Sequence, residues 1–273
     1  TGRTYITPLA SSLLQGEIAS GIMLDTTWHL LQHYVCSIPT LAICNVGIPI
    51  GFTFSLVEDS AIYKDFFEIF QNAFGFPIQD YISVAMSDQG SPLKKAIKEL
   101  GLDHIFCLRH LLVSLKKTRF AQQIGNLVSA VNECDFNELN ELYSKKWKEI
   151  SDEKELSQLK RTLHKLGLCF NERIEIEDSN RWKQISMQHR AQYRMPSCTN
   201  QLESTHGHMN AHIPRRNSMW PSVERIIHSI LQKNQKFESH FKHNYLRYKN
   251  KTKNILTNTP DIIMEKIIKQ YKT

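Results

Sequence analysis

The chain has 273 residues, of which 41% are hydrophobic and 10% aromatic, which is enough apolar material for a core and too much for a largely disordered protein. No run of eighteen apolar residues occurs, so we expect no membrane span. The 34 Lys and Arg residues exceed the 27 Asp and Glu residues by a formal net charge of +7, which favours an acidic partner such as nucleic acid.

Strands are predicted in the first third of the chain. Short apolar or alternating runs bounded by turn residues lie at residues 22–24, 41–44 and 50–56, with residues 45–49 as the turn between the last two. The simplest arrangement of three sequential strands is an antiparallel meander.

A helix follows, because five aromatic residues recur at spacings of three and four and end near Gly75: Tyr63, Phe66, Phe67, Phe70 and Phe74. Their pattern is typical of core packing. Two further strands are predicted at residues 81–86 and 103–107, separated by a short helix at residues 92–100. The order strand, helix, strand implies a parallel pair beside the meander.

Residues 108–194 are charged and favour helix, and residues 167–194 are ambiguous. Helical sequence resumes near residue 199, breaks at Pro214 and restarts near residue 218, with a polar, lysine-rich tail after residue 249. The predicted helices of this half span residues 108–118, 121–133, 136–150, 153–166 and 221–248.

Six cysteines are scattered along the chain without a Cys-x-x-Cys pair, so we expect free thiols in a reducing compartment. The chain begins at Thr1 and shows no secretory signal, so we expect a segment of a longer intracellular protein.

Three carboxylates are the candidate catalytic residues. Asp25 and Asp88 directly follow the first and fourth predicted strands, and strand ends are where ligands gather in parallel sheets. Neighbouring carboxylates repel unless a cation neutralises them, and their oxygen atoms suit Mg²⁺ or Mn²⁺. Glu203 is the candidate third ligand. Each residue alone is more typical of a cap, a turn or a solvated surface, so only the combination indicates a site.

Five blocks of the sequence stand in a fixed order: residues 23–27 around Asp25, residues 39–52, residues 87–97 around Asp88, the C-x-x-H signature of Cys107 and His110, and residues 199–204 around Glu203. These blocks, within about residues 18–210, resemble the Mutator-like element (MULE) transposases, whose catalytic domain is an RNase H-like fold with a DDE triad. One departure is His206, where family members commonly carry Asn, in a helix that also holds His208 and His212.

The resemblance implies an α/β fold: an RNase H-like mixed five-stranded sheet flanked by helices, with an all-helical insertion between the second Asp and the Glu. The expected units are the first part of the core at residues 18–120, the insertion at residues 121–196, the Glu-bearing and C-terminal helices at residues 197–248, and a basic tail at residues 249–273.

The implied function is DNA strand cleavage and transfer at transposon ends, with two Mg²⁺ or Mn²⁺ ions held by Asp25, Asp88 and Glu203. The implied partners are transposon-end and target DNA and further copies of the chain, in the nucleus. One alternative is a domesticated DNA-binding regulator without activity. A cellular RNase H-like nuclease or integrase is a second, against which the C-x-x-H block and the helical insertion argue.

Two other groups of residues remain open to more than one interpretation. His104, Cys107 and His110 recur at intervals of three, which invites zinc but supplies only three soft ligands. The resemblance implies instead that Cys107 and His110 pack the fifth strand against the following helix. Contacts to DNA phosphates and a solvated basic face are equally compatible with the nearby cations, which are Arg109, Lys116, Lys117, Arg215 and Arg216.

Overall fold

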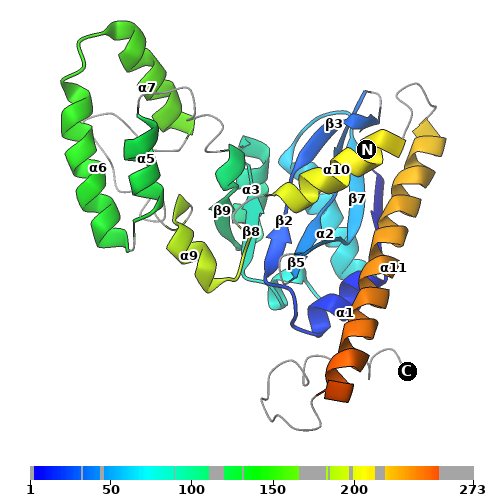
Figure 1. Ribbon diagram of the computed structural model, residues 1–273. Helices are drawn as coiled ribbons and strands as arrows, with labels where there is room; N and C mark the ends of the chain where they lie inside the picture. The colour runs from blue at the N-terminus through cyan, green and yellow to red at the C-terminus, as the bar shows by residue number, and fades with distance from the viewer. Residues whose placement is uncertain are drawn as a thin grey trace.

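The computed structural model describes residues 3–31, 33–43, 46–88, 90–110, 120–130, 132–165, 183, 185–196, 199–212 and 219–251 (Figure 1). Strands and a few helices make up its first half and helices fill the described part of the second, so the α/β class is confirmed. Among the described residues, no helix is both long and apolar enough to cross a membrane.

A mixed five-stranded sheet forms the centre of the fold, in the order β6-β5-β2-β8-β9. The strands β6, β5 and β2 pair antiparallel, and β8 and β9 then add in parallel. A meander beside a parallel pair was predicted, but its third predicted strand, residues 50–56, lies in the second sheet, and residues 46–49 take its place here. The strands are β2 (Gly21–Met23), β5 (Thr40–Ile43), β6 (Val46–Pro49), β8 (Val84–Ser87) and β9 (Asp103–Phe106).

A second, antiparallel sheet was not predicted from the sequence. Its order is β1-β7-β4-β3, and its strands are β1 (Arg3–Ile6), β7 (Gly51–Ser55), β4 (Tyr34–Ser37) and β3 (Thr26–Leu31). Three of them continue strands of the first sheet after a short break: β2 leads into β3, β4 into β5, and β6 into β7. Each strand of the meander is therefore much longer than predicted.

Residues 46–49 are also a correction, because they form β6 rather than the predicted turn. The prolines and glycines of this segment signal a turn, yet Ile48 is buried and pairs with Leu41 across the sheet. The predicted strand at residues 81–86 begins later, since a 3-10 turn (η1, Ile78–Asp80) precedes it and β8 starts at Val84.

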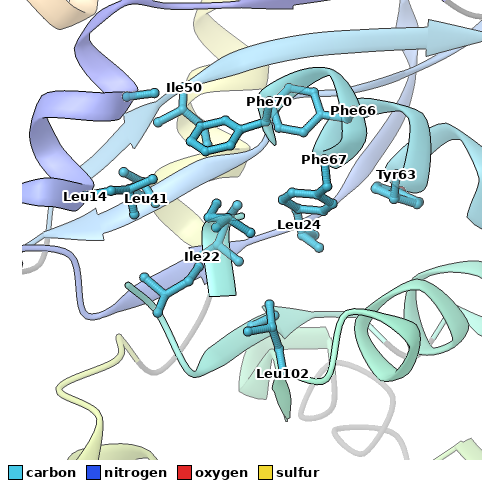
Figure 2. Packing of buried hydrophobic residues seen from close by; sticks show 14 of the residues in the cluster. Leu14, Ile22, Leu24, Leu41, Ile50, Tyr63, Phe66, Phe67, Phe70 and Leu102 are labelled. Carbon is cyan, nitrogen blue, oxygen red and sulfur yellow. The ribbon is translucent and has the colours of Figure 1, made fainter. Parts of the chain in front are cut away.

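One face of the five-stranded sheet is covered by α1 (Leu9–Gln15), α2 (Ser60–Phe74) and α3 (Ser91–Glu99). The aromatic stripe of α2 is buried there as predicted, with Phe66, Phe67 and Phe70 against Leu24 and its neighbours (Figure 2). The helix ends at Gly75, whose positive φ of 78° allows its N–H to bond the Gln71 carbonyl.

Two further helices, α10 (Asn200–His212) and α11 (Met219–Lys251), lie on the other side of the sheets (Figure 1). Leu202 of α10 packs on the five-stranded sheet with Met23 and Met86. Ile226 and Ile230 of α11 are fully buried against residues of the second sheet. These contacts fix α10 above the ends of β2 and β8.

The segment between Asp88 and Glu203 includes helices with a core of their own (Figure 1). Tyr143, Trp147 and Leu159 are buried in this core, and Phe106 of β9 joins it to the sheet. Asn132 starts α6, because its side chain accepts a hydrogen bond from the Asp135 N–H. The helices are α5 (Ala121–Val128), α6 (Glu133–Lys148), α7 (Glu153–Lys165) and α9 (Met187–Gln192).

These helices agree in type with the predictions for residues 121–133, 136–150 and 153–166, although α5 ends earlier and α6 begins earlier than predicted. Most of the predicted helix at residues 108–118 and most of the basic tail lie outside the described residues. The proposed unit boundaries stay predictions.

Candidate functional site

Asp25 and Asp88 lie beyond the ends of two neighbouring parallel strands. Met23 of β2 is paired with Met86 of β8, and the Leu24 N–H donates a hydrogen bond to the Met86 carbonyl at 2.8 Å. Each aspartate follows its methionine by two residues, so the register brings the two carboxylates to the same edge of the sheet. Asp25 occupies the break at which the chain passes from β2 into β3.

The Asp25 carboxylate is buried, with 9% of the residue exposed. Its Oδ1 accepts the Thr26 N–H at 2.9 Å. Burial, and then the negative charge of Asp88, raise the pKa of Asp25 to about 7, while His110 and the Thr26 N–H pull the other way. Glu203 also raises this pKa. The site therefore concentrates more negative charge than its surroundings neutralise.

Asp88 also shapes the loop that it begins. Its Oδ1 accepts the Gly90 N–H at 2.9 Å, which closes a tight turn before α3. A Cβ atom at residue 90 would lie 3.0 Å from that oxygen, so glycine suits the turn. Asp88 is thus both a turn former and a member of the carboxylate cluster.

Glu203 approaches the cluster from the first turn of α10. Its Oε2 forms an ion pair with Arg109 Nη1 at 2.5 Å, and its Oε1 accepts a hydrogen bond from Thr199 Oγ1 at 3.2 Å. His110 Nε2 lies 3.8 Å from the same Oε1. Arg109, which the sequence suggests as a phosphate contact, is in this structure the partner of the third carboxylate.

The C-x-x-H residues join the end of β9 to the start of α10. The buried Cys107 Sγ accepts hydrogen bonds from the backbone N–H and the hydroxyl of Thr199, at 3.3 and 3.2 Å. Burial raises the pKa of Cys107, but hydrogen bonds from His110 and Thr199 outweigh burial and bring it to about 7. The hydrogen bond to Cys107 correspondingly raises the pKa of His110 to about 9.

The set of His104, Cys107 and His110, which left a zinc interpretation open, is not assembled among the described residues. Donor atoms of Cys107, His110 and Glu203 all lie within 4.8 Å of one another and could hold a metal ion. His104 is absent from this group, and its Nε2 is instead 2.8 Å from the hydroxyl of Ser87. Glu203, rather than His104, is the third donor beside the C-x-x-H pair.

His206 is a site neighbour whose role the sequence did not reveal. It is buried one helical turn after Glu203, and its Nδ1 lies 4.0 Å from Asp25 Oδ2. Burial and the charge of Lys233 lower its pKa to about 4, so the ring is neutral at pH 7. Its spacing of three residues from Glu203 is the signal that could have placed it on the same helix face.

The donor chemistry fits a hard divalent cation, because the buried Asp25 and the partly buried Asp88 offer oxygen atoms and repel one another. Glu203 could join them after its ion pair with Arg109 opens. The other predicted basic contacts, Lys116, Lys117, Arg215 and Arg216, lie outside the described residues. His212 is the last residue of α10.

Comparisons with known proteins add no family or relative to this geometry. No protein-family model matches the chain. No curated protein matches it significantly.

Proposed function

We propose that this chain is the catalytic domain of a DDE transposase of the Mutator-like kind, which cleaves and transfers DNA strands with Mg²⁺ or Mn²⁺. The observation that carries the proposal is the gathering of Asp25, Asp88 and Glu203. They come from three separate elements, and both of the other carboxylates raise the pKa of Asp25. Three acidic groups that gather around a buried carboxylate and repel one another are difficult to explain as a purely structural cluster.

The sheet order supports the same proposal. An RNase H-like core has three antiparallel strands followed by two parallel ones, which agrees with the order β6-β5-β2-β8-β9. In such a core the first and fourth strands bear the two aspartates, as β2 and β8 do here. The helices α5, α6 and α7 between Asp88 and Glu203 agree with the expected insertion.

Asp25 and Asp88 would hold the cations, which when bound activate a water or a 3′-hydroxyl and stabilise the leaving oxygen. Glu203 would complete the set once Arg109 releases it. Arg109 is 52% exposed at its side chain, so it can turn toward a DNA phosphate. His206, being neutral, leaves the charge of Asp25 available to a cation.

The proposed partner is DNA, for which the formal net charge of +7 is favourable. Transposition joins two transposon ends, so we further propose an assembly of more than one copy, acting in the nucleus. Cys107 and His110 would act by holding α10 against β9, which sets the position of Glu203.

The test is calorimetric titration of Mn²⁺ into the protein, with and without a short DNA duplex, for the parent, Asp25→Asn and Asp88→Asn. We expect both substitutions to abolish Mn²⁺ binding, because each removes a ligand of one site. Asp80→Asn, in the exposed turn η1, is the matched control and should bind as the parent does. Metal-dependent cleavage that survives in Asp88→Asn would refute the assignment.

A regulator without catalytic activity is the second candidate, and the Arg109–Glu203 ion pair is the observation that favours it. If that pair stays closed, Glu203 is not available to a cation. A parent protein that binds duplex DNA but no Mn²⁺ would favour the regulator over the enzyme.

A further inference from the structure

A cavity of about 210 Å³ lies between α10 and α11, the two helices that run beside the second sheet (Figure 1). Helix α10 contributes Ser204, Thr205 and Met209 to its walls. Helix α11 contributes Ser229, Gln232, Lys233 and Lys236. The cavity is separate from the carboxylate cluster, although α10 borders both.

The chemistry of this lining is that of an anion site. The lining residues include two lysines, three residues with hydroxyl groups and one glutamine, and none of the described residues that line the cavity carries a carboxylate. The ammonium, hydroxyl and amide N–H groups can all donate hydrogen bonds, and the lysine ammonium cannot accept one. A phosphate group accepts several hydrogen bonds and carries the opposite charge.

Lys233 places a partly buried positive charge beside the cavity. Its Nζ donates a hydrogen bond to the Thr205 hydroxyl, a neutral group. Burial lowers the pKa of Lys233 to about 8, and within the described part of the chain no acidic group opposes that shift. The charge of Lys233 also lowers the pKa of His206, so the electrostatic effect of this lysine reaches a buried residue of α10. An anion in the cavity would neutralise this charge.

We infer that the cavity between α10 and α11 binds a phosphate group, held by Lys233, Lys236 and the hydroxyls of Ser204 and Thr205. The cavity volume of about 210 Å³ is smaller than the roughly 300 to 1,000 Å³ of pockets for drug-sized ligands, so the cavity suits a group as small as phosphate. Free inorganic phosphate and a backbone phosphate of DNA share this chemistry.

If the phosphate belongs to DNA, the inference deepens the proposed function and rests on it. Ser204 and Thr205 follow Glu203 directly in α10. A backbone phosphate held at the cavity would fix the helix that presents Glu203 and His206. The binding of a DNA strand would then influence the position of the Glu203 carboxylate through helix α10.

The first experiment measures how fast an amine-acylating reagent labels each lysine, read by peptide mass spectrometry. Lys98 of α3 is the internal control, since it is exposed and distant from the cavity. We expect inorganic phosphate to slow the labelling of Lys233 several-fold and to leave Lys98 unchanged. Chloride at equal ionic strength should protect neither. Equal protection by chloride, or no protection by phosphate, overturns the inference.

A short DNA duplex in the same assay distinguishes the two sources. Protection of Lys233 by both phosphate and duplex supports a DNA backbone phosphate, and protection by phosphate alone supports a free anion. Protection by duplex alone overturns the inference, because DNA would then only cover the surface. Asp88→Asn should keep the phosphate protection, so failure of the catalytic proposal and failure of this one are distinguishable.

A variant gives an independent measure. Lys233→Met should reduce by about one the slope of log binding constant against log salt for duplex DNA, as expected for one lost phosphate contact. Lys98→Met makes the same change of charge and should leave the slope unchanged. Equal slopes in the parent and both variants would exclude DNA as the source of the phosphate.

Discussion

At the scale of single residues, the fold opposes the ionisation of Asp25. Burial and the neighbouring charge of Asp88 raise its pKa, so its negative form destabilises the metal-free protein. The folded protein holds this proton up to about pH 7, whereas the unfolded chain releases it near the ordinary aspartate value. The contribution of Asp25 to stability therefore falls as the pH rises from about 4 to 7.

We accordingly expect Asp25→Asn to stabilise the metal-free protein at pH 8 and to have less effect at pH 5. A gain of 1 kcal/mol raises the melting temperature by roughly 2–4 °C in a domain of 150–250 residues, so the expected shift is several degrees. Calorimetric melting in the presence of a chelator measures it. Asp65→Asn, exposed on α2, is the control. A lower melting temperature at pH 8 would contradict the expectation.

Arg109 and Mn²⁺ would compete for Glu203. Partly exposed ion pairs contribute about 0.2–1 kcal/mol, so removing the arginine should tighten Mn²⁺ binding by a factor between about 1.4 and 5. Titration of Arg109→Met without DNA measures this change. The same variant should bind duplex more weakly, since it loses a cation. Unchanged Mn²⁺ affinity would mean that Glu203 is not a ligand.

At the scale of secondary structure, close packing around β2 sets the position of the site. A Cβ atom on Gly21 would lie 2.6 Å from Val84 Cγ1 and 2.8 Å from Met195 Sδ. Because residue 21 is a glycine, β8 and the residues after α9 can pack closely against β2. Asp25 lies two residues after the end of β2, so this packing also sets its position. Gly125 of α5, by contrast, has open space around it.

We predict that Gly21→Ala destabilises the fold by about 1–3 kcal/mol, the usual cost of overpacking. Gly125→Ala is the matched substitution and should stabilise by about 0.5–1 kcal/mol, because alanine favours helix. Urea unfolding of the two variants checks both signs. Destabilisation of similar size in both would show that Gly21 is not specially packed.

The strands show where sequence patterns were sufficient and where they were not. The short runs that became β2, β5 and β8 are continuously buried, and their apolar residues identified them. β3 was missed because its register shifts between Thr27 and Leu31 and its Trp28 is 52% exposed, so no alternation is visible. The hairpin to β4 turns at His33, whose φ is 67°, without a glycine to mark it.

At the scale of the whole molecule, β9 connects a hydrophobic core of the sheet with the core of the helical part. Ile105 of β9 packs with Met23 and Met86 on the five-stranded sheet, whereas Phe106 lies in the second core, which helices α5, α6 and α7 share. The buried Arg190 of α9 donates to the Phe106 carbonyl at 3.0 Å, which adds a polar tie between them. The carboxylate cluster belongs to the sheet side of this junction.

We therefore expect Trp147→Ala to unfold the helical part before the sheet. Deleting a buried tryptophan costs about 3–5 kcal/mol, and Trp147 is fully buried in the second core. Hydrogen exchange should rise in α5, α6 and α7 and remain slow in β2 and β8, with Mn²⁺ binding retained. Faster exchange throughout the sheet, with loss of Mn²⁺ binding, would show that the molecule unfolds as one unit.

The sequence alone predicted most of the described helices and the strands β2, β5 and β8 from local periodicity, and it indicated Asp25 and Asp88 by their places at strand ends. The choice of Glu203 rested on its predicted helix and on the resemblance of residues 199–204 to the transposase family. Only the tertiary structure decided what surrounds these carboxylates. Arg109 contacts Glu203, and His206 lies beside Asp25, because β9 and α10 pack together. The phosphate-sized cavity likewise needs two helices. Contacts between segments that are distant in the chain leave no periodic signal in the sequence, so only the folded structure reveals them.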